Sequence, residues 1–172
     1  MTKTSNFDAD KLRALLRRQK IATMEELKEA LGAKGDATIF RKLKELSYYS
    51  SYSDRGRYYT AKDVAEFNDL GLWTCRSVHF SRYGTLVATT EAFVNQAEAG
   101  YFAEELMSIL GVDAKDALRN LVQKNRIFRE KVAGRYLYCS CDRTRQKGQL
   151  AAREIEQQQG RIQRERVDKD LT

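Results

Sequence analysis

The sequence contains no proline and only one histidine and one tryptophan. Average usage would supply about eight or nine prolines, so proline-rich linkers and cis-proline turns are excluded, and turns must rely on Gly, Asn, Asp and Ser. One histidine excludes a paired-histidine metal nuclease centre. There is also no glycine-rich loop followed by lysine that could cradle a phosphate. We therefore predict a protein that is not an enzyme and needs no cofactor.

Long apolar runs are missing as well. No stretch approaches the ~20 apolar residues of a membrane helix, and Met1–Thr4 is not followed by the apolar core of a signal peptide. The number of cysteines, three, is odd, and the sequence has no export signal. Both features fit a reducing compartment, where thiols stay free or bind metal. These absences predict a soluble, cytoplasmic protein with no membrane partner.

Basic residues outnumber acidic ones by 31 to 24, which gives the 172 residues a net charge of +7. A basic excess favours a polyanionic partner, and nucleic acid is the commonest one. The excess is uneven, because residues 1–60 hold 13 basic and 8 acidic residues, whereas residues 61–141 hold 10 of each. The charge therefore favours the first third of the chain as the part that contacts nucleic acid.

Three short blocks occur twice in the same order, which indicates an internal repeat. The pairs, 78 or 79 residues apart, are Glu25–Leu27 with Glu104–Leu106, Phe40–Leu43 with Leu118–Leu121, and Gly56–Tyr58 with Gly134–Tyr136. Matched order and spacing predict two copies of one module. We divide the chain into module 1 (residues 1–60), a connector (61–80), module 2 (81–141) and a charged helical or disordered tail (142–172).

Local signals predict similar elements in each copy. An apolar stripe predicts a helix over Asp8–Lys20, a capping box of Thr23 and Glu26 opens a second helix, and Gly32 ends it. The other expected helices are Asp36–Leu46, Lys62–Asn68, Tyr83–Gln96, Phe102–Leu110 and Ala114–Lys124, and the expected strands are Tyr48–Ser53, Arg57–Thr60, Leu72–Phe80, Ile127–Lys131 and Arg135–Cys139. The predicted fold class is mainly α with small β-hairpins (α+β).

Three helices, a glycine turn between the second and third, and a closing hairpin resemble the winged helix-turn-helix family over roughly residues 8–60 and 81–140. The run Thr38–Leu43 with Leu46 is similar to the recognition helix of that family. The resemblance implies two tandem winged helix-turn-helix modules with double-stranded DNA as their partner. An α-helix fits the ~12 Å major groove, and a hairpin beside it can lay basic side chains on the adjacent phosphates.

The candidate DNA contacts are polar and basic side chains on the third helices and the hairpins. Arg can bridge guanine O6 and N7, whereas Lys and Thr more often bind phosphate. The candidates are Thr38, Arg41, Lys42, Lys44, Arg55 and Arg57 in module 1, and Lys115, Arg119, Asn120, Arg129, Lys131 and Arg135 in module 2. The alternative for each set is an ordinary solvated surface. Most tyrosines between Tyr48 and Tyr59 are expected to pack the hairpin.

All three cysteines and the histidine fall in two clusters, Cys75 with His79 and Cys139 with Cys141. Three thiolates and one imidazole suit tetrahedral zinc. The spacing differs from that of a C-x2-C knuckle, so we favour free thiols and no metal, and keep zinc as the minor alternative.

The sequence thus predicts a double-stranded DNA-binding protein, a sequence-recognising transcription regulator in which the third helix and basic hairpin of module 1 read DNA. Module 2 either assists in DNA binding or binds a protein partner. The tail is a second place where a protein partner could bind. Two alternatives stay open. One is the DNA-recognition part of a transposase or replication-initiator system, and the other is a winged-helix interaction scaffold in a chromosome-organising complex.

Overall fold

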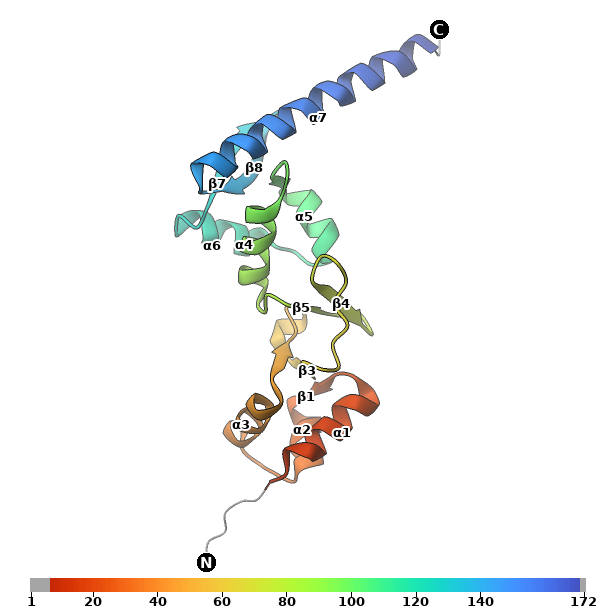
Figure 1. Cartoon of the computed structure of the whole chain (residues 1–172), viewed down its shortest axis with the longest axis vertical. Coiled ribbons are helices and arrows are strands. Elements are labelled where there is room, and N and C mark those ends of the chain that lie inside the picture. The colour runs from red at the N-terminus through yellow and green to blue at the C-terminus, as the bar shows by residue number, and fades with distance from the viewer. Residues whose placement is uncertain (1–6, 171–172) are drawn as a thin grey trace, which may run out of the picture. The chain divides into compact units, whose positions relative to one another are not determined.

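The computed structural model describes residues 7–170 as an α+β protein with seven α-helices and three small antiparallel sheets (Figure 1). The chain divides into two compact units, and the division falls between Thr89 and Thr90. This point lies within helix α4 (Leu86–Gln96). Among the described residues, no helix is both long and apolar enough to cross a membrane.

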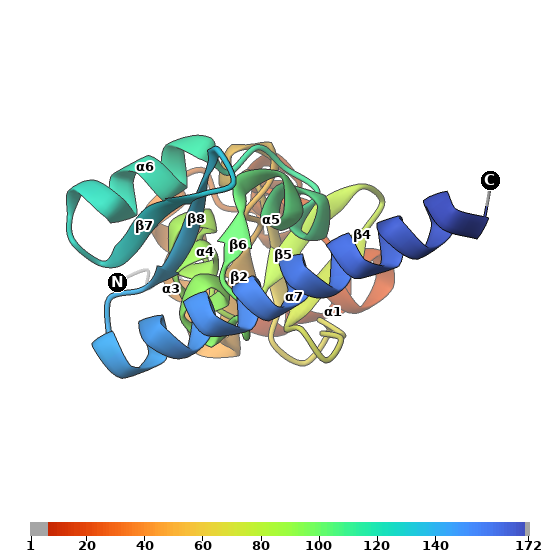
Figure 2. The same ribbon diagram turned by 90° about the horizontal axis from the view of Figure 1, so that it is seen from above.

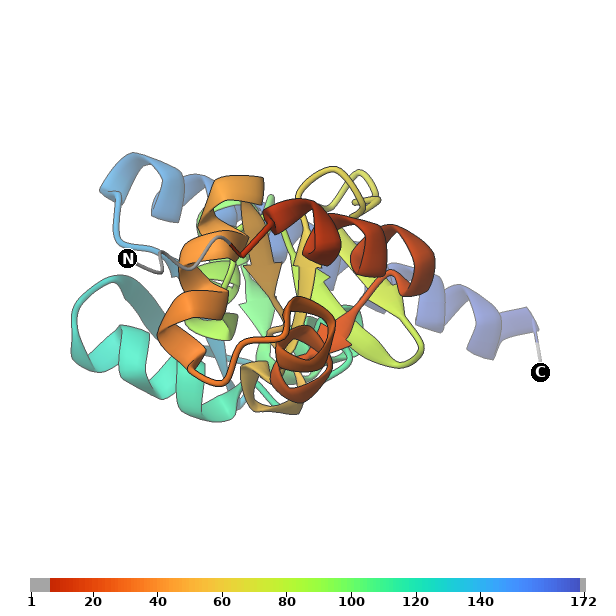
Figure 3. The same cartoon turned by 90° about the horizontal axis from the view of Figure 1, so that it is seen from below.

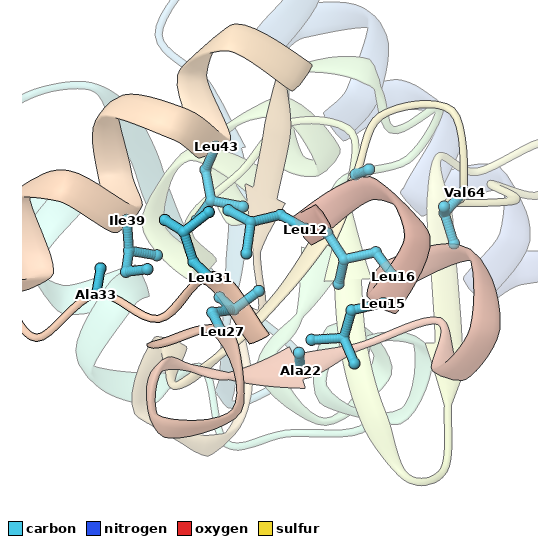
Figure 4. Packing of buried hydrophobic residues seen from close by; sticks show 11 residues of the cluster. Leu12, Leu15, Leu16, Ala22, Leu27, Leu31, Ala33, Ile39, Leu43 and Val64 are labelled. Carbon is cyan, nitrogen blue, oxygen red and sulfur yellow. The ribbon is translucent and has the colours of Figure 1, made fainter. Parts of the chain in front are cut away.

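The first unit is built on three helices that share one core. Helices α1 (Ala9–Gln19), α2 (Met24–Leu31) and α3 (Asp36–Leu46) contact one another (Figure 3, red to orange). The large side chains that they bury together are Leu12, Leu15, Leu16, Leu27, Leu31, Ile39 and Leu43 (Figure 4). Full burial of one leucine contributes ~1.5–3 kcal/mol relative to exposure. This core therefore holds α3 against the first two helices.

Local capping sets the bounds of α2. The hydroxyl of Thr23 accepts a hydrogen bond from the N–H of Glu26 (3.2 Å), and the Glu26 carboxylate accepts one from the N–H of Thr23 (2.9 Å). At the other end, Gly32 adopts a left-handed conformation with a φ of 78°. The capping box and the glycine stop predicted from the sequence are both confirmed.

A three-stranded sheet closes the first module. Its strands β1 (Ala22–Thr23), β2 (Tyr48–Ser50) and β3 (Tyr58–Ala61) pair in the order β1-β3-β2. Strand β2 stops three residues before the predicted end, because the N–H of Tyr52 donates to the carbonyl of His79 in a different strand. The first hairpin is therefore shorter than expected.

The connector holds a second hairpin, formed by β4 (Leu72–Cys75) and β5 (Val78–Ser81). The strand tendency predicted there is confirmed, but the helix predicted at 62–68 is wrong, since residues 62–64 form a turn and residues 65–68 have no regular structure. The side chain of Asn68 accepts hydrogen bonds from the N–H groups of Leu70 and Leu72 (2.9 and 3.0 Å). Such local side-chain bonds compete with helix formation.

The second unit has the same order of elements after α4. Its sheet order, β6-β8-β7, corresponds to β1-β3-β2 in the first unit. The elements are β6 (Tyr101–Phe102), α5 (Ala103–Leu110), α6 (Lys115–Gln123), β7 (Ile127–Val132) and β8 (Arg135–Ser140). Helix α4 begins three residues later than predicted. The N–H of Gly84 donates to the carbonyl of Ser81, and this bond closes a turn before the helix starts.

The predicted charged tail is a helix, α7 (Arg143–Asp170), whose first turns lie along β8 (Figures 1 and 2). Leu150 packs against the buried side chains of Phe102, Leu137 and Cys139. Gln149 and Arg153 are also buried, whereas residues 161–169 are all exposed. The start of the tail is therefore part of the second unit, while its last turns extend into solvent.

Candidate nucleic-acid interface

Five basic side chains line one open groove of about 490 Å³ in the second unit. We call it the basic groove. Its cations are Lys115 and Arg119 on α6, Arg129 and Lys131 on β7, and Arg135 on β8. All five were predicted from the sequence, and the structure brings them together. Asn120, the sixth candidate of this module, is half-buried on α6 and does not line the groove.

Secondary-structure periodicity explains why these cations meet. Lys115 and Arg119 are four residues apart, so they share one face of α6. Arg129 and Lys131 are two residues apart on β7, so they share one face of the hairpin. Their register partners across the hairpin are Tyr138 and Tyr136, which line the groove as well. One helix face and one sheet face thus form its two walls.

Two aromatic rings contact the cations of the hairpin. The guanidinium carbon of Arg129 lies 4.1 Å, and the ammonium nitrogen of Lys131 lies 5.7 Å, from the centre of the Tyr136 ring. The guanidinium carbon of Arg135 lies 3.8 Å from the centre of the Phe102 ring. These distances are within the ~6 Å range of a cation–π interaction. The rings hold the cations without neutralising their charge.

Acidic groups near the groove are few. Glu104 is the one carboxylate in the lining, and it pairs with Arg135 at 3.3 Å. Asp116, one position after Lys115 on α6, pairs with Arg119 at 2.8 Å but is itself 95% exposed. Exposed pairs of this kind contribute little stability, about 0–1 kcal/mol. Cations therefore outnumber carboxylates in the groove lining by five to one, and such an excess attracts anions.

In the first unit the candidates on α3 are unequal. Arg41 and Lys44 are exposed, and Thr38 is half-buried. The side chain of Lys42 is only 17% exposed, and its ammonium group pairs with Glu45 at 3.1 Å. Lys42 is therefore less exposed than Arg41 and Lys44, and its ammonium group already has a partner.

Arg55 and Arg57 lie at the turn of the first hairpin, and both are exposed. Arg55 has a left-handed backbone, with a φ of 54° and a ψ of 29°. Neither arginine forms an ion pair with any side chain in the described part of the chain. The neighbouring tyrosines behave as expected from packing, since Tyr48 and Tyr59 contact each other and Phe40 with ring centres 5.7–6.3 Å apart.

The four residues of the zinc alternative are divided between the two units. Cys75 and His79 lie in the first unit and Cys139 and Cys141 in the second. The imidazole Nδ1 of His79 is 2.7 Å from the hydroxyl of Thr74, and the exposed thiol of Cys141 donates to a backbone carbonyl. Cys139 is fully buried, and burial, with a smaller contribution from Glu130, raises its pKa to about 11. Within residues 7–170, no three such ligands cluster where a metal ion could bind.

Tyr136, Phe102 and Glu104 are parts of the site that the sequence candidates omitted. A signal for Tyr136 was available, because the repeated block Gly134–Tyr136 ends on it and the alternation of β7 places Lys131 opposite it. No comparable signal exists for Phe102. Its contact with Arg135 depends on the pairing of β6 with β8, which a local pattern does not reveal.

No known protein family and no curated protein matches this sequence. Among solved structures, the DIP2311 protein from Corynebacterium diphtheriae is similar at 14% sequence identity with a TM-score of 0.27. The match covers 77% of this chain and 26% of that one, so the chain spans about a quarter of that protein's length. A likeness this weak assigns neither a fold family nor a function.

Proposed function

We propose that this protein binds double-stranded DNA through two winged helix-turn-helix modules and that the basic groove of the second module is its main contact. The observation that carries the proposal is the convergence of five cations from α6 and the β7–β8 hairpin on one groove with a single acidic residue. In this class of module the third helix enters the major groove, and the hairpin lies on the flanking backbone. The walls of the basic groove come from those two elements.

The topology of each unit supports the assignment of class. In both units a short strand precedes the second helix, the third helix follows a tight turn, and a hairpin closes the sheet. Each second helix ends on a left-handed glycine, Gly32 or Gly111, with φ values of 78° and 73°. This arrangement supports the assignment to the winged helix-turn-helix class. The two units would then be tandem copies that differ in surface charge.

The proposed roles follow from side-chain chemistry. Arg129, Lys131 and Arg135 would bind phosphates, because they lie on the hairpin and point into the groove lining. Arg119 on α6 is the candidate for base edges, since Arg pairs with guanine and this side chain lines the groove. In the first module, Arg41, Lys44, Arg55 and Arg57 are the exposed cations that would add contacts.

The test is duplex binding measured by fluorescence anisotropy over a range of salt concentrations. Each phosphate contact releases counterions and contributes about 0.9 to the slope of log K against log salt. The double variant Arg129→Ala/Lys131→Ala should therefore lower the slope by about 1.8. The matched control is Arg164→Ala/Arg166→Ala, which removes the same charge from the exposed end of α7.

Two results would overturn the proposal. The first is the absence of duplex binding by the unaltered protein at low salt. The second is an equal loss of slope in the groove variant and the α7 control, because that would indicate attraction by net charge without a defined site. An unbiased selection of bound duplexes at physiological salt would then report whether the protein recognises a sequence, as a regulator requires.

A further inference from the structure

Tyr136 occupies an unusual position for a large aromatic side chain. It is 40% exposed, it lies in the basic groove, and it is not part of the apolar cluster beneath the sheet. Its ring faces Arg129 at 4.1 Å and Lys131 at 5.7 Å. The ring therefore contacts solvent and two cations at once.

The register of the hairpin explains this cluster. Lys131 pairs with Tyr136 across β7 and β8, and Arg129 pairs with Tyr138, so Arg129 is the diagonal neighbour of Tyr136 on the same face. Diagonal neighbours on one sheet face are within reach of long and aromatic side chains. One ring can therefore contact both cations.

The chemistry of the ring suits a positioning role. Two cations on neighbouring positions of one strand face repel each other and would spread apart in solvent. The negative face of an aromatic ring attracts both and restrains their rotamers, while each keeps its full charge and most of its donors for a ligand. A carboxylate in the same place would hold the cations but cancel their charge.

The first module supplies an internal comparison. The strand registers of the two modules are offset by 79 residues, because the pair Tyr48 and Ala61 corresponds to the pair Ile127 and Ser140. The position equivalent to Tyr136 is therefore Arg57, and those equivalent to Arg129 and Lys131 are Ser50 and Tyr52. The first module thus has neither the ring nor the two cations at these positions of its hairpin.

We infer that Tyr136 is a positioning residue of the basic groove, holding Arg129 and Lys131 at a fixed spacing for the phosphates of a nucleic-acid backbone. The inference rests on the proposed function and extends it to a residue that carries no charge. Binding then does not have to order two flexible side chains, because they are already ordered in the free protein.

The test compares Tyr136→Leu, which removes the ring, with Tyr136→Phe, which keeps it. Loss of an exposed cation–π contact corresponds to about a two- to fivefold weakening. Tyr136→Leu should therefore bind duplex about two- to fivefold more weakly at every salt concentration. The salt slope should not change, because the number of cations is the same. Tyr136→Phe should bind like the unaltered protein, because it keeps the ring.

A measurement without DNA separates this inference from the proposed function. In the free protein, the ring current of Tyr136 should shift the side-chain NMR signals of Arg129 upfield, and the shift should vanish in Tyr136→Leu and persist in Tyr136→Phe. An absent shift overturns the inference even if the protein binds DNA. Equal binding by Tyr136→Leu and the unaltered protein, or weak binding by Tyr136→Phe, overturns it as well. So does a salt slope of Tyr136→Leu that falls as in Arg129→Ala/Lys131→Ala. Failure of the unaltered protein to bind duplex overturns the proposed function and, with it, the role of the ring.

Discussion

Arg153 and Glu105 are joined by two hydrogen bonds although 48 residues separate them. The guanidinium Nη1 donates to one carboxylate oxygen at 2.9 Å and Nη2 donates to the other at 2.7 Å. The remaining donors of Arg153 reach the backbone carbonyls of Ala99 and Gly100 at 3.1 and 2.9 Å. Arg153 is 8% exposed. One buried cation therefore joins α7 to the start of α5 through hydrogen bonds.

Removal of this anchor should destabilise the second unit. Arg153→Ala removes a donor from two buried carbonyls and the cation that pairs with the Glu105 carboxylate. Because Glu105 is 41% exposed, we expect a loss of about 2–3 kcal/mol in the free energy of unfolding, less than for a fully buried pair. Urea unfolding followed by far-UV circular dichroism measures it. Arg164→Ala, on the exposed end of α7, should change stability by less than about 0.5 kcal/mol. Equal effects of the two substitutions would contradict the anchoring role.

Acid should weaken the same contact. Burial alone would raise the pKa of Glu105, but hydrogen bonds from Arg153 and from the N–H of Phe102 outweigh it and lower the pKa. Stabilisation by the carboxylate is therefore complete above its usual pKa of about 4.3 and is lost as the pH falls through the lower folded value. Glu105→Gln should be less stable than the unaltered protein at neutral pH, and the difference should shrink as the pH falls below the usual pKa and vanish below the lowered folded pKa. A gap that stays constant with pH would refute the assignment.

The thiols should react in a fixed order. Cys139 is fully buried with a pKa raised to about 11, so its thiolate fraction at pH ~8 is only ~0.1%. Cys141 is exposed. Iodoacetamide should label Cys141 in the native protein and Cys139 only after unfolding, as peptide mapping by mass spectrometry would reveal. Labelling of both at the same rate would contradict the buried position of Cys139.

Two neighbours on α3 should differ in their effect on DNA binding. Arg41 is exposed, whereas Lys42 is 17% exposed and paired with Glu45. If the first module contacts phosphates, Arg41→Ala should lower the salt slope of duplex binding by about 0.9 and Lys42→Ala by less than half of that. The substitutions remove the same formal charge, so they control for each other. A larger effect of Lys42→Ala would place the DNA on a different face of α3.

Local signals were sufficient for much of the fold. The capping box at Thr23 and the stop at Gly32 involve residues within one helical turn, so the sequence alone predicted both ends of α2. The hairpin turn at Ala133 and Gly134 was predicted in the same way. The helix predicted at 62–68 was wrong because Asn68 forms a turn with the residues that follow it.

The contact of the tail with the second unit could not be predicted from composition. Gln149 and Arg153 look like ordinary polar residues of a solvated helix. Their partners include the carbonyls of Val94, Ala97 and Ala99, more than 50 residues away. Buried polar groups of this kind are identified only by the acceptors that satisfy them, and those are set by tertiary structure.

The candidate site shows that the net charge of a segment does not locate a cluster of cations. Residues 61–141 hold equal numbers of basic and acidic residues, which favoured the first module as the DNA contact. The helical spacing of Lys115 and Arg119 and the strand spacing of Arg129 and Lys131 nevertheless gather cations on one groove. Many of the balancing carboxylates lie elsewhere, as Glu91 does in its pair with Arg126. The place where cations cluster depends on helix and strand periodicity and on strand pairing. The net charge of a segment contains no information on either.

The exposed end of α7 extends far beyond the contact between Arg153 and Glu105. At ~1.5 Å per residue, the 17 residues from Arg153 to Asp170 extend ~26 Å beyond the anchor. A tilt of about 10° at Arg153 would therefore displace the tip by roughly 4–5 Å. Small changes in the hydrogen bonds between Arg153 and Glu105 would therefore be amplified at the tip. A spectroscopic label at the end of α7 would report them.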